Sequence, residues 1–283
     1  MNEHLDQYTM RALCEALVVS RSGFYTWRNR DQITSELDLA IASEFNRQQS
    51  RAGATSMACQ IREDGFAVST RTIGRSLKKQ GLSVRYKRKF RHTTDSKHKY
   101  AVAPNLLDRQ FKVEHPNRIW VVDITYIRSS QGWLYLAAMI DLFNRQVVGW
   151  QMSERMDQEL VNGALEAALV NRGKPKEVLI HTDRGSQYCA HSFVDMISKN
   201  KLQQSMSRKG NCWNNAVAES FFASLKKQAI YRHKLESRQD LRGRVFEYIE
   251  HYYNRVRRHS ANGCVTPVEY QRLYNQSLEG ADI

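Results

Sequence analysis

The sequence lacks the long apolar segments by which membrane and secreted proteins are recognised. No stretch approaches the ~20 consecutive apolar residues that a membrane-spanning helix needs. Residues 1–4, Met-Asn-Glu-His, show neither the basic nor the apolar region of a signal peptide. We therefore expect no membrane partner and a cytoplasmic location.

Cysteine is sparse and scattered. The five cysteines include no Cys-x-x-Cys pair, so the sequence predicts neither a disulfide framework nor a zinc site. We expect packing residues in a reducing compartment. The cysteines are Cys14, Cys59, Cys189, Cys212 and Cys264.

Acidic residues are scarce beside basic ones. The 283 residues include 29 aspartates and glutamates against 43 lysines and arginines, a net charge of +14. A surplus of this size indicates a polyanionic partner, for which nucleic acid is the default. The apolar content of 41% is enough for one large domain or for two to three small ones.

Two helical pairs are predicted in the first 83 residues. Residues 8–30 show a helix, a break and a second short helix, typical equally of a helix-turn-helix and of a small structural pair. Residues 37–45 and 57–61 predict two more helices. After a turn at Asp64-Gly65, a further helix runs from about Ser69 to Lys79, capped by Ser69 or Thr70. Its exposed side favours DNA reading over packing through Arg71, Arg75 and Lys78.

A basic run follows these helices and has little apolar periodicity. We interpret it as a linker whose cations contact DNA phosphates, although such runs are often only solvated. The residues proposed to bind DNA here are Arg85, Lys87, Arg88, Lys89 and Arg91.

From Arg118 onward the pattern predicts a mixed α/β unit. Three strands at 119–127, 133–140 and 146–150 form an antiparallel meander. Helices are expected at 158–170, 193–199 and 212–227, with strands at 178–181 and 203–207. Because the first three strands lack crossovers, this order is no simple βαβ array. An amphipathic segment at 241–253, a basic patch and a short helix after Thr266-Pro267 complete the chain.

Three carboxylates in this unit carry the predicted chemistry. Asp123 lies inside an apolar strand, where burial without a partner is costly. Asp183 ends a strand before a glycine turn, where α/β sheets place ligand-binding groups. Glu219 borders the apolar stripe of the 212–227 helix, which taken alone also fits an ordinary ion-pair face. If the three converge, Mg²⁺ can offset their repulsion and support phosphoryl transfer.

The segments around these carboxylates resemble the D-D-35-E signature of integrase-core transposases. They read Trp-Val-Val-Asp-Ile-Thr-Tyr, His-Thr-Asp-Arg-Gly-Ser-Gln-Tyr and Asn-Asn-Ala-Val-Ala-Glu-Ser-Phe-Phe. Further matches occur at 140–145, 148–150, 253–255, 258–260 and 266–267. The chain resembles, over essentially its whole length, the second-frame protein (OrfB) of bacterial insertion sequences of the IS3 type.

The resemblance implies a ribonuclease-H-like core, a mixed five-stranded sheet with helices, after an all-α helix-turn-helix region. The expected ranges are 1–33 and 34–83 for two helix-turn-helix segments, 84–112 for the basic linker, 113–232 for the catalytic core and 233–283 for a helical extension. It also implies Mg²⁺-dependent 3′-end cleavage and strand transfer, with Mn²⁺ as a possible substitute. Asp123, Asp183 and Glu219 would be the catalytic residues and metal ligands.

The implied partners are the element's terminal inverted repeats, the target DNA, further copies of this chain on DNA, and an upstream OrfA-type protein fused by frameshifting. The location would then be the nucleoid. Near the metals and the C-terminus, Lys226, Lys227, Arg257 and Arg258 are further DNA-binding candidates.

Several positions leave alternatives open. The family usually has aspartate where Asn214 stands, which removes a negative charge from a helix start. Asp141 is expected to be a turn or surface residue paired with Arg145 rather than a ligand. His181 and Gln187 either orient Asp183, contact DNA or serve structure, and Trp213 is expected to pack.

Two other functions compete with transposition. A retroviral-type integrase would carry an N-terminal His-His-Cys-Cys zinc module, which the sequence lacks. A non-catalytic DNA-binding regulator would keep the fold without its chemistry, and the three intact carboxylates argue against it.

Overall fold

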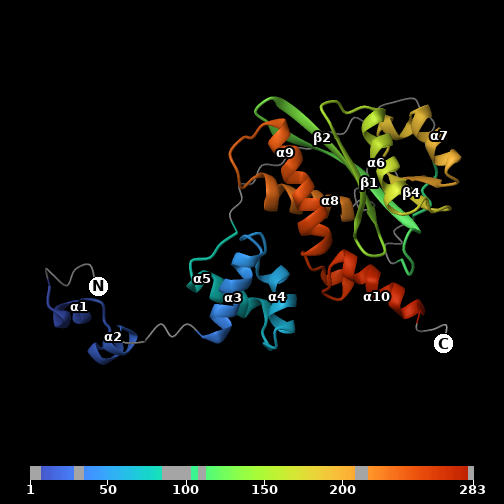
Figure 1. Cartoon of the computed structure of the whole chain (residues 1–283). Helices are drawn as coiled ribbons and strands as arrows, with labels where there is room; N and C mark the ends of the chain where they lie inside the picture. The colour runs from blue at the N-terminus through green and yellow to red at the C-terminus, as the bar shows by residue number, and fades with distance from the viewer. Residues whose placement is uncertain (1–7, 29–34, 85–102, 108–112, 208–215, 280–283) are drawn as a thin grey trace.

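The computed structural model describes residues 8–28, 35–84, 103–107, 113–207 and 216–279 (Figure 1). Within them a five-stranded sheet has the order β3-β2-β1-β4-β5. β1 (Ile119–Ser129), β2 (Gly132–Asp141) and β3 (Val147–Ser153) are antiparallel. β4 (Leu179–Thr182) and β5 (Gln203–Met206) run parallel to β1. This mixed sheet is that of the ribonuclease-H-like fold, which confirms the predicted meander and the fold class.

Two apolar layers cover the sheet (Figure 1). On one face lie α6 (Gln158–Asn171) and α7 (His191–Lys199), and on the other lie α8 (Ala216–Leu225) and α9 (Arg238–Phe246). Side chains alternate along each strand, so neighbouring residues enter opposite layers. Trp120 and Val122 of β1 join the α6 layer, whereas Val121 and Ile127 join the α8 layer.

Gly149 in β3 permits the close approach of α6 to the sheet. A Cβ atom there would lie 2.4 Å from both the Ala164 carbonyl oxygen and the Ala168 backbone nitrogen. Only a residue without a side chain fits between these backbones.

Helices α8 and α9 both continue as π-helix, which the sequence pattern did not predict. α8 passes into η4 (Lys226–Ile230), and α9 passes into η5 (Glu247–Tyr253). α10 (Pro267–Glu279) has 13 residues and is longer than the short helix expected, with Thr266 Oγ1 accepting the Glu269 N–H at 3.2 Å. The C-terminal extension shares the α8 layer of the core, since Leu241, Val245 and Tyr248 pack there.

The described residues of the N-terminal region form helices and no strand. These helices are α1 (Met10–Ala16), α2 (Arg21–Arg28), α3 (Glu36–Arg47), α4 (Ala54–Glu63) and α5 (Thr70–Lys79). α3 to α5 enclose their own core, which includes Ile41, Met57 and Ile73. Ser69 caps α5 by accepting the Thr72 N–H at 3.1 Å, as predicted. The bounds of the five expected segments stay predictions.

The three-helix unit α3–α5 is joined to the C-terminal extension by a disulfide between Cys59 of α4 and Cys264. This corrects the expectation that all cysteines are unpaired packing residues. Scattered cysteines 205 positions apart in sequence give no pairing signal. Cys14 and Cys189 are free and buried. Ion pairs of Arg51 with Glu247 at 2.8 Å and of Arg258 with Glu63 reinforce the junction.

Candidate active site

Asp123 is placed by β1 on the α8 side of the sheet. It has the strand parity of Val121 and Ile127, and its Oδ1 accepts the Ile124 N–H at 2.8 Å. Burial raises the pKa of Asp123 to about 8, and the negative charges of Asp183 and then Glu219 contribute to the rise. Asp183 and Glu219 therefore both lie near enough to Asp123 for their charges to act on it.

Asp183 directly follows β4, at the carboxyl end of the strand parallel to β1. Its Oδ1 accepts the Gly185 N–H at 2.9 Å, which closes the turn. A Cβ atom at Gly185 would lie 2.9 Å from Gln187 Oε1 and 3.1 Å from Asp183 Oδ1. The glycine thus leaves room for the carboxylate to fold back over the turn.

Glu219 is exposed in the first turn of α8. The predicted apolar stripe behind it is present, because Ala218, Phe221, Phe222 and Leu225 are all buried against the sheet. This stripe holds the helix while Glu219 projects from its edge. About two helical turns later, Lys226 places its ammonium 4.8 Å from the centroid of the Tyr126 ring. Burial lowers the pKa of Lys226, and the charge of Asp123 opposes that shift.

The donor set fits a magnesium ion, although the carboxylates do not form a compact cluster within the described residues. Among the residues that the structure describes, no three His, Cys, Asp or Glu side chains stand together closely enough to bind a metal. The chemistry is nevertheless right, since Mg²⁺ prefers carboxylate oxygens and its charge would offset both the burial and the neighbouring carboxylates that raise the Asp123 pKa.

The buried hydroxyl of Tyr188 also fits an ion or its water. It has no hydrogen-bond partner within the described part of the chain, and burial raises its pKa well above the usual value, helped by the charges of Asp183 and Asp123. We did not single out Tyr188 from the sequence. The sequence does contain a signal for it, because Tyr188 is an aromatic residue with a hydroxyl group at the end of the Asp183 motif.

The predicted DNA-binding residues fall into four groups, of which the C-terminal arginines are the fourth. Arg71, Arg75 and Lys78 are exposed together on α5. Lys227 is exposed beside Lys226. The third group lies outside the described residues, as do Asn214 and Trp213, and consists of Arg85, Lys87, Arg88, Lys89 and Arg91.

The two C-terminal arginines are engaged within the chain. The Arg258 guanidinium pairs with Glu63 and donates to Gln60 Oε1 at 2.9 Å. The Arg257 guanidinium lies 5.6 Å from the Tyr253 ring centroid and contacts His259. These contacts give both side chains a packing role, and their contact with DNA stays a prediction.

Asp141 departs from its expected surroundings. It begins the expected turn, where its carbonyl accepts the Arg145 N–H at 2.8 Å. It is nevertheless fully buried rather than at the surface, and its carboxylate pairs with Arg172 at 3.3 Å. It also accepts the N–H groups of Asn117 at 2.9 Å and Phe143 at 3.0 Å. Arg172 ends α6, 31 positions away, so no local pattern revealed this partner.

His181 and Gln187 make internal contacts. His181 is buried, its Nδ1 lies 2.9 Å from Ser205 Oγ, and burial lowers its pKa to about 4. Gln187 Nε2 donates to the Met156 carbonyl at 3.2 Å. Both contacts favour the structural alternative.

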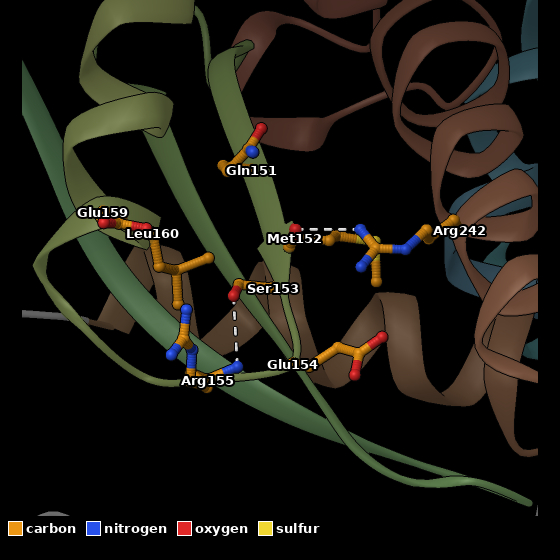
Figure 2. Close-up of a pocket in the computed structure, with 8 residues that line it drawn as sticks. All are labelled: Gln151, Met152, Ser153, Glu154, Arg155, Glu159, Leu160 and Arg242. Carbon is orange, nitrogen blue, oxygen red and sulfur yellow. Dashed lines mark hydrogen bonds between the residues drawn. The ribbon is translucent and has the colours of Figure 1, made fainter.

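A cavity of about 450 Å³ lies elsewhere, between the end of β3, the start of α6 and Arg242 of α9 (Figure 2). Arg242 Nη1 donates to the Met152 carbonyl at 2.9 Å, and the Arg155 N–H donates to Ser153 Oγ at 3.1 Å. None of the three carboxylates lines this cavity, so it is separate from the candidate active site.

Comparison with known proteins identifies the family. Two family models described as "Integrase core domain" match residues 113–212 and 200–267. The chain is 40% identical over 278 residues to the transposase InsF for insertion sequence IS3A of Escherichia coli (strain K12), covering 96% of both proteins. This chain belongs to the IS3-family transposases.

A second relative agrees with this assignment. The IS3-family transposase is 39% identical over 269 residues to an uncharacterized 31 kDa protein of insertion element IS600 of Shigella sonnei, covering 93% of this chain and 99% of that protein. Among solved structures, the HTLV-2 integrase catalytic core domain in complex with magnesium matches with a TM-score of 0.43 and 16% identity. That match covers 55% of this chain and 96% of the integrase core.

Within the described ranges of this transposase, no helix is long and apolar enough to cross a membrane.

Proposed function

We propose that this transposase catalyses Mg²⁺-dependent cleavage at the 3′ ends of an insertion sequence and the transfer of those ends into target DNA. The supporting observation is the electrostatic coupling of Asp123, Asp183 and Glu219. The negative charges of Asp183 and Glu219 both act on Asp123, although the three residues lie on a strand end, on a helix and within a strand, respectively. Carboxylates are brought together at such a cost when a cation will bind them.

Asp123, Asp183 and Glu219 would hold the cations, and Mn²⁺ is the expected substitute for Mg²⁺. A pair of such ions would supply stabilisation of the attacking and leaving oxygens of a phosphoryl transfer. The chain contributes position and charge. The sheet fixes Asp123 and the Gly185 turn fixes Asp183, and Glu219, exposed on α8, would complete the cation site. Lys226 supplies a cation for the DNA backbone beside Asp123.

Specific binding would come from the α5 surface. Arg71, Arg75 and Lys78 lie on one exposed side of a capped helix that follows α4 across a short turn, the arrangement of a recognition helix in the major groove. The basic run after it, Lys227, Arg257 and Arg258 are proposed to contact phosphates.

The proposed partners are the terminal inverted repeats of the element and the target DNA. We further propose that copies of this chain assemble on DNA and that a frameshift fusion with an upstream OrfA-type protein is the active form. The relatives in Escherichia coli are named as transposases for insertion sequences, which supports the DNA partners. The proposed location is the bacterial nucleoid.

The test is cleavage and joining of DNA carrying the element's ends by Glu219→Gln. The substitution keeps the size of the side chain and removes a charged ligand, so we expect at least a 100-fold loss of both reactions with Mg²⁺ present. Glu166→Gln is the matched control, because Glu166 is an exposed glutamate on α6, away from the other two carboxylates.

Three outcomes separate the alternatives. Cleavage by Glu219→Gln at the parent rate would refute the ligand assignment. Specific binding of the ends by the parent fusion protein without any nicking would favour a DNA-binding regulator instead. A comparable loss in Glu166→Gln would show that the assay reports folding rather than the site.

A further inference from the structure

The outer end of the β1–β2 hairpin carries aromatic and basic side chains that the proposed chemistry does not use. Trp133 of β2 lies directly opposite Arg128 of β1, and Tyr135 lies opposite Tyr126. Directly paired residues of antiparallel strands share a face, and so do residues two apart. Tyr126, Arg128 and Trp133 therefore share one face, and we call them the hairpin platform.

The hairpin platform presents an aromatic surface to solvent. Trp133 is 46% exposed and Arg128 is exposed, while Tyr126 is half-buried. The Trp133 and Tyr126 rings meet edge to face at 5.1 Å between centroids and 89° between planes. A tryptophan with this exposed fraction loses much of the stabilising free energy that burial of its ring would provide. Such exposure is typical of a binding surface.

The turn of the hairpin is held firmly. The Ser130 N–H donates to the Glu236 carbonyl at 2.7 Å, and the Arg238 N–H donates to Gln131 Oε1 at 2.9 Å. Ser129 Oγ donates to the Gly132 carbonyl at 2.7 Å. Trp133 thus stands on an anchored strand end, so a ligand would meet a preformed surface.

Lys226 connects the hairpin platform to the candidate active site. Its ammonium lies 4.8 Å from the Tyr126 ring centroid, and its charge interacts with that of Asp123, three residues earlier on β1. β1 pairs with β4 only over 119–121. Asp123 has the strand parity of the α8 layer, whereas the hairpin platform has that of the α6 layer. Among the described strands, the edge of β1 beyond Val121 has no neighbour, so a ligand that reaches Trp133 from Asp123 would pass round this edge.

Aromatic rings alternating with cations are the chemistry of single-stranded nucleic acid binding. Every base has a π face that stacks on an aromatic ring, while lysine and arginine neutralise the adjoining phosphates. A protein partner is less suited to this surface, because it would have to pair Arg128 and Lys226 as well as cover Trp133.

We propose that the hairpin platform binds an unpaired nucleotide a few positions along the strand from the phosphate under attack, with the base on Trp133 and neighbouring phosphates on Arg128 and Lys226. The inference rests on the proposed function, since the DNA strand must reach Asp123. It adds that the reacting DNA end is locally unpaired and that the chain holds it open by stacking.

The test compares two DNA probes carrying the same terminal sequence, one fully paired and one with four unpaired nucleotides at the reacting end. Binding is measured with Ca²⁺ in place of Mg²⁺ so that no chemistry intervenes. We expect Trp133→Ala to weaken binding of the unpaired probe about 5- to 100-fold and to leave the paired probe within about twofold. Trp133→Phe should recover most of the loss because it restores an aromatic face.

Phe246→Ala is the control, since it removes another exposed aromatic ring, on α9 across the sheet. A second readout is photocrosslinking of 5-iodouracil in the unpaired nucleotides, expected at Trp133 and mapped by mass spectrometry.

The outcomes distinguish two failures. If the parent protein shows no preference for the element's ends, the proposed function fails. If it binds those ends but Trp133→Ala weakens both probes equally or neither, and no crosslink maps to Trp133, the hairpin platform is not a nucleotide site.

Discussion

Asp38 connects the proposed recognition helix to the rest of the three-helix unit, and its substitution tests how α5 is held. Asp38 lies on α3 and is 7% exposed. Its carboxylate accepts hydrogen bonds from Ser76 Oγ and, at 2.9 Å, from the Lys79 ammonium, both on α5. Asp38→Asn keeps the shape of the side chain but removes the charge that both donors favour.

The magnitude follows from the pKa. The hydrogen bonds from Ser76 and Lys79 lower the pKa of Asp38 from 3.8 to about 2, against the opposing effect of burial. Each pKa unit corresponds to about 1.4 kcal/mol, so the ionised carboxylate stabilises the fold by about 2 kcal/mol at neutral pH. Because the Lys79 side chain is 52% exposed, solvent screening reduces this to about 1–2 kcal/mol.

The assay is amide hydrogen exchange of the full chain by mass spectrometry. At pH 7 we expect residues 70–79 to exchange about 5- to 30-fold faster in Asp38→Asn, since 1.4 kcal/mol is a factor of ten. Glu36→Gln is the control, an exposed carboxylate in the first turn of the same helix. An unchanged rate in α5, or an equal effect of Glu36→Gln, would refute the reasoning.

The sign of the pH dependence provides an independent check. The folded-state pKa of Asp38 lies below its unfolded value, so the stabilisation is present above about pH 4 and is lost as the pH falls toward 2. In Asp38→Asn, the part of the acid-induced loss of stability that comes from protonation of Asp38 should be absent.

Two further predictions concern packing and DNA binding. Gly149→Ala should unfold the catalytic core or destabilise it by more than about 3 kcal/mol in urea denaturation, because the added Cβ would clash with the α6 backbone. Gly243→Ala on α9 is the control. A Cβ there would have nothing within 4 Å, so this variant should be more stable by about 0.5–1 kcal/mol. Equal effects would contradict the packing argument. Alanine at Arg71, Arg75 or Lys78 should weaken binding to the element's ends by about 1–3 kcal/mol for each lost base contact and should relax specificity for those ends. Unchanged binding of the ends, or an equal loss on unrelated DNA, in all three variants would contradict a recognition role for α5.

Local sequence predicted the elements that carry the site. The alternation of 119–127 predicted β1, and the apolar stripe behind Glu219 predicted the buried side of α8. The strand ending at Asp183 was also expected where β4 lies. These predictions succeed because the period of a strand or helix fixes which of its side chains are buried. That period can be read from the order of apolar and polar residues in a short segment.

Contacts between distant segments were decided by the tertiary structure. The ion pair of Asp141 with Arg172, the Cys59–Cys264 disulfide and the internal pairing of Arg258 each join residues whose sequence separation shows no pattern. The π-helical turns after α8 and α9 likewise escaped prediction.

The hairpin platform shows the division most clearly. The sequence by itself determined that β1 and β2 are strands with a turn at Gln131-Gly132, and that Asp123 interrupts an apolar run. The register of the two strands then decided that Trp133 faces Arg128, and the packing of η4 decided that Lys226 covers Tyr126. Periodicity predicts on which side of its own helix or strand a residue lies. Register and packing depend on the whole core, and they determine which residues of other elements it contacts there.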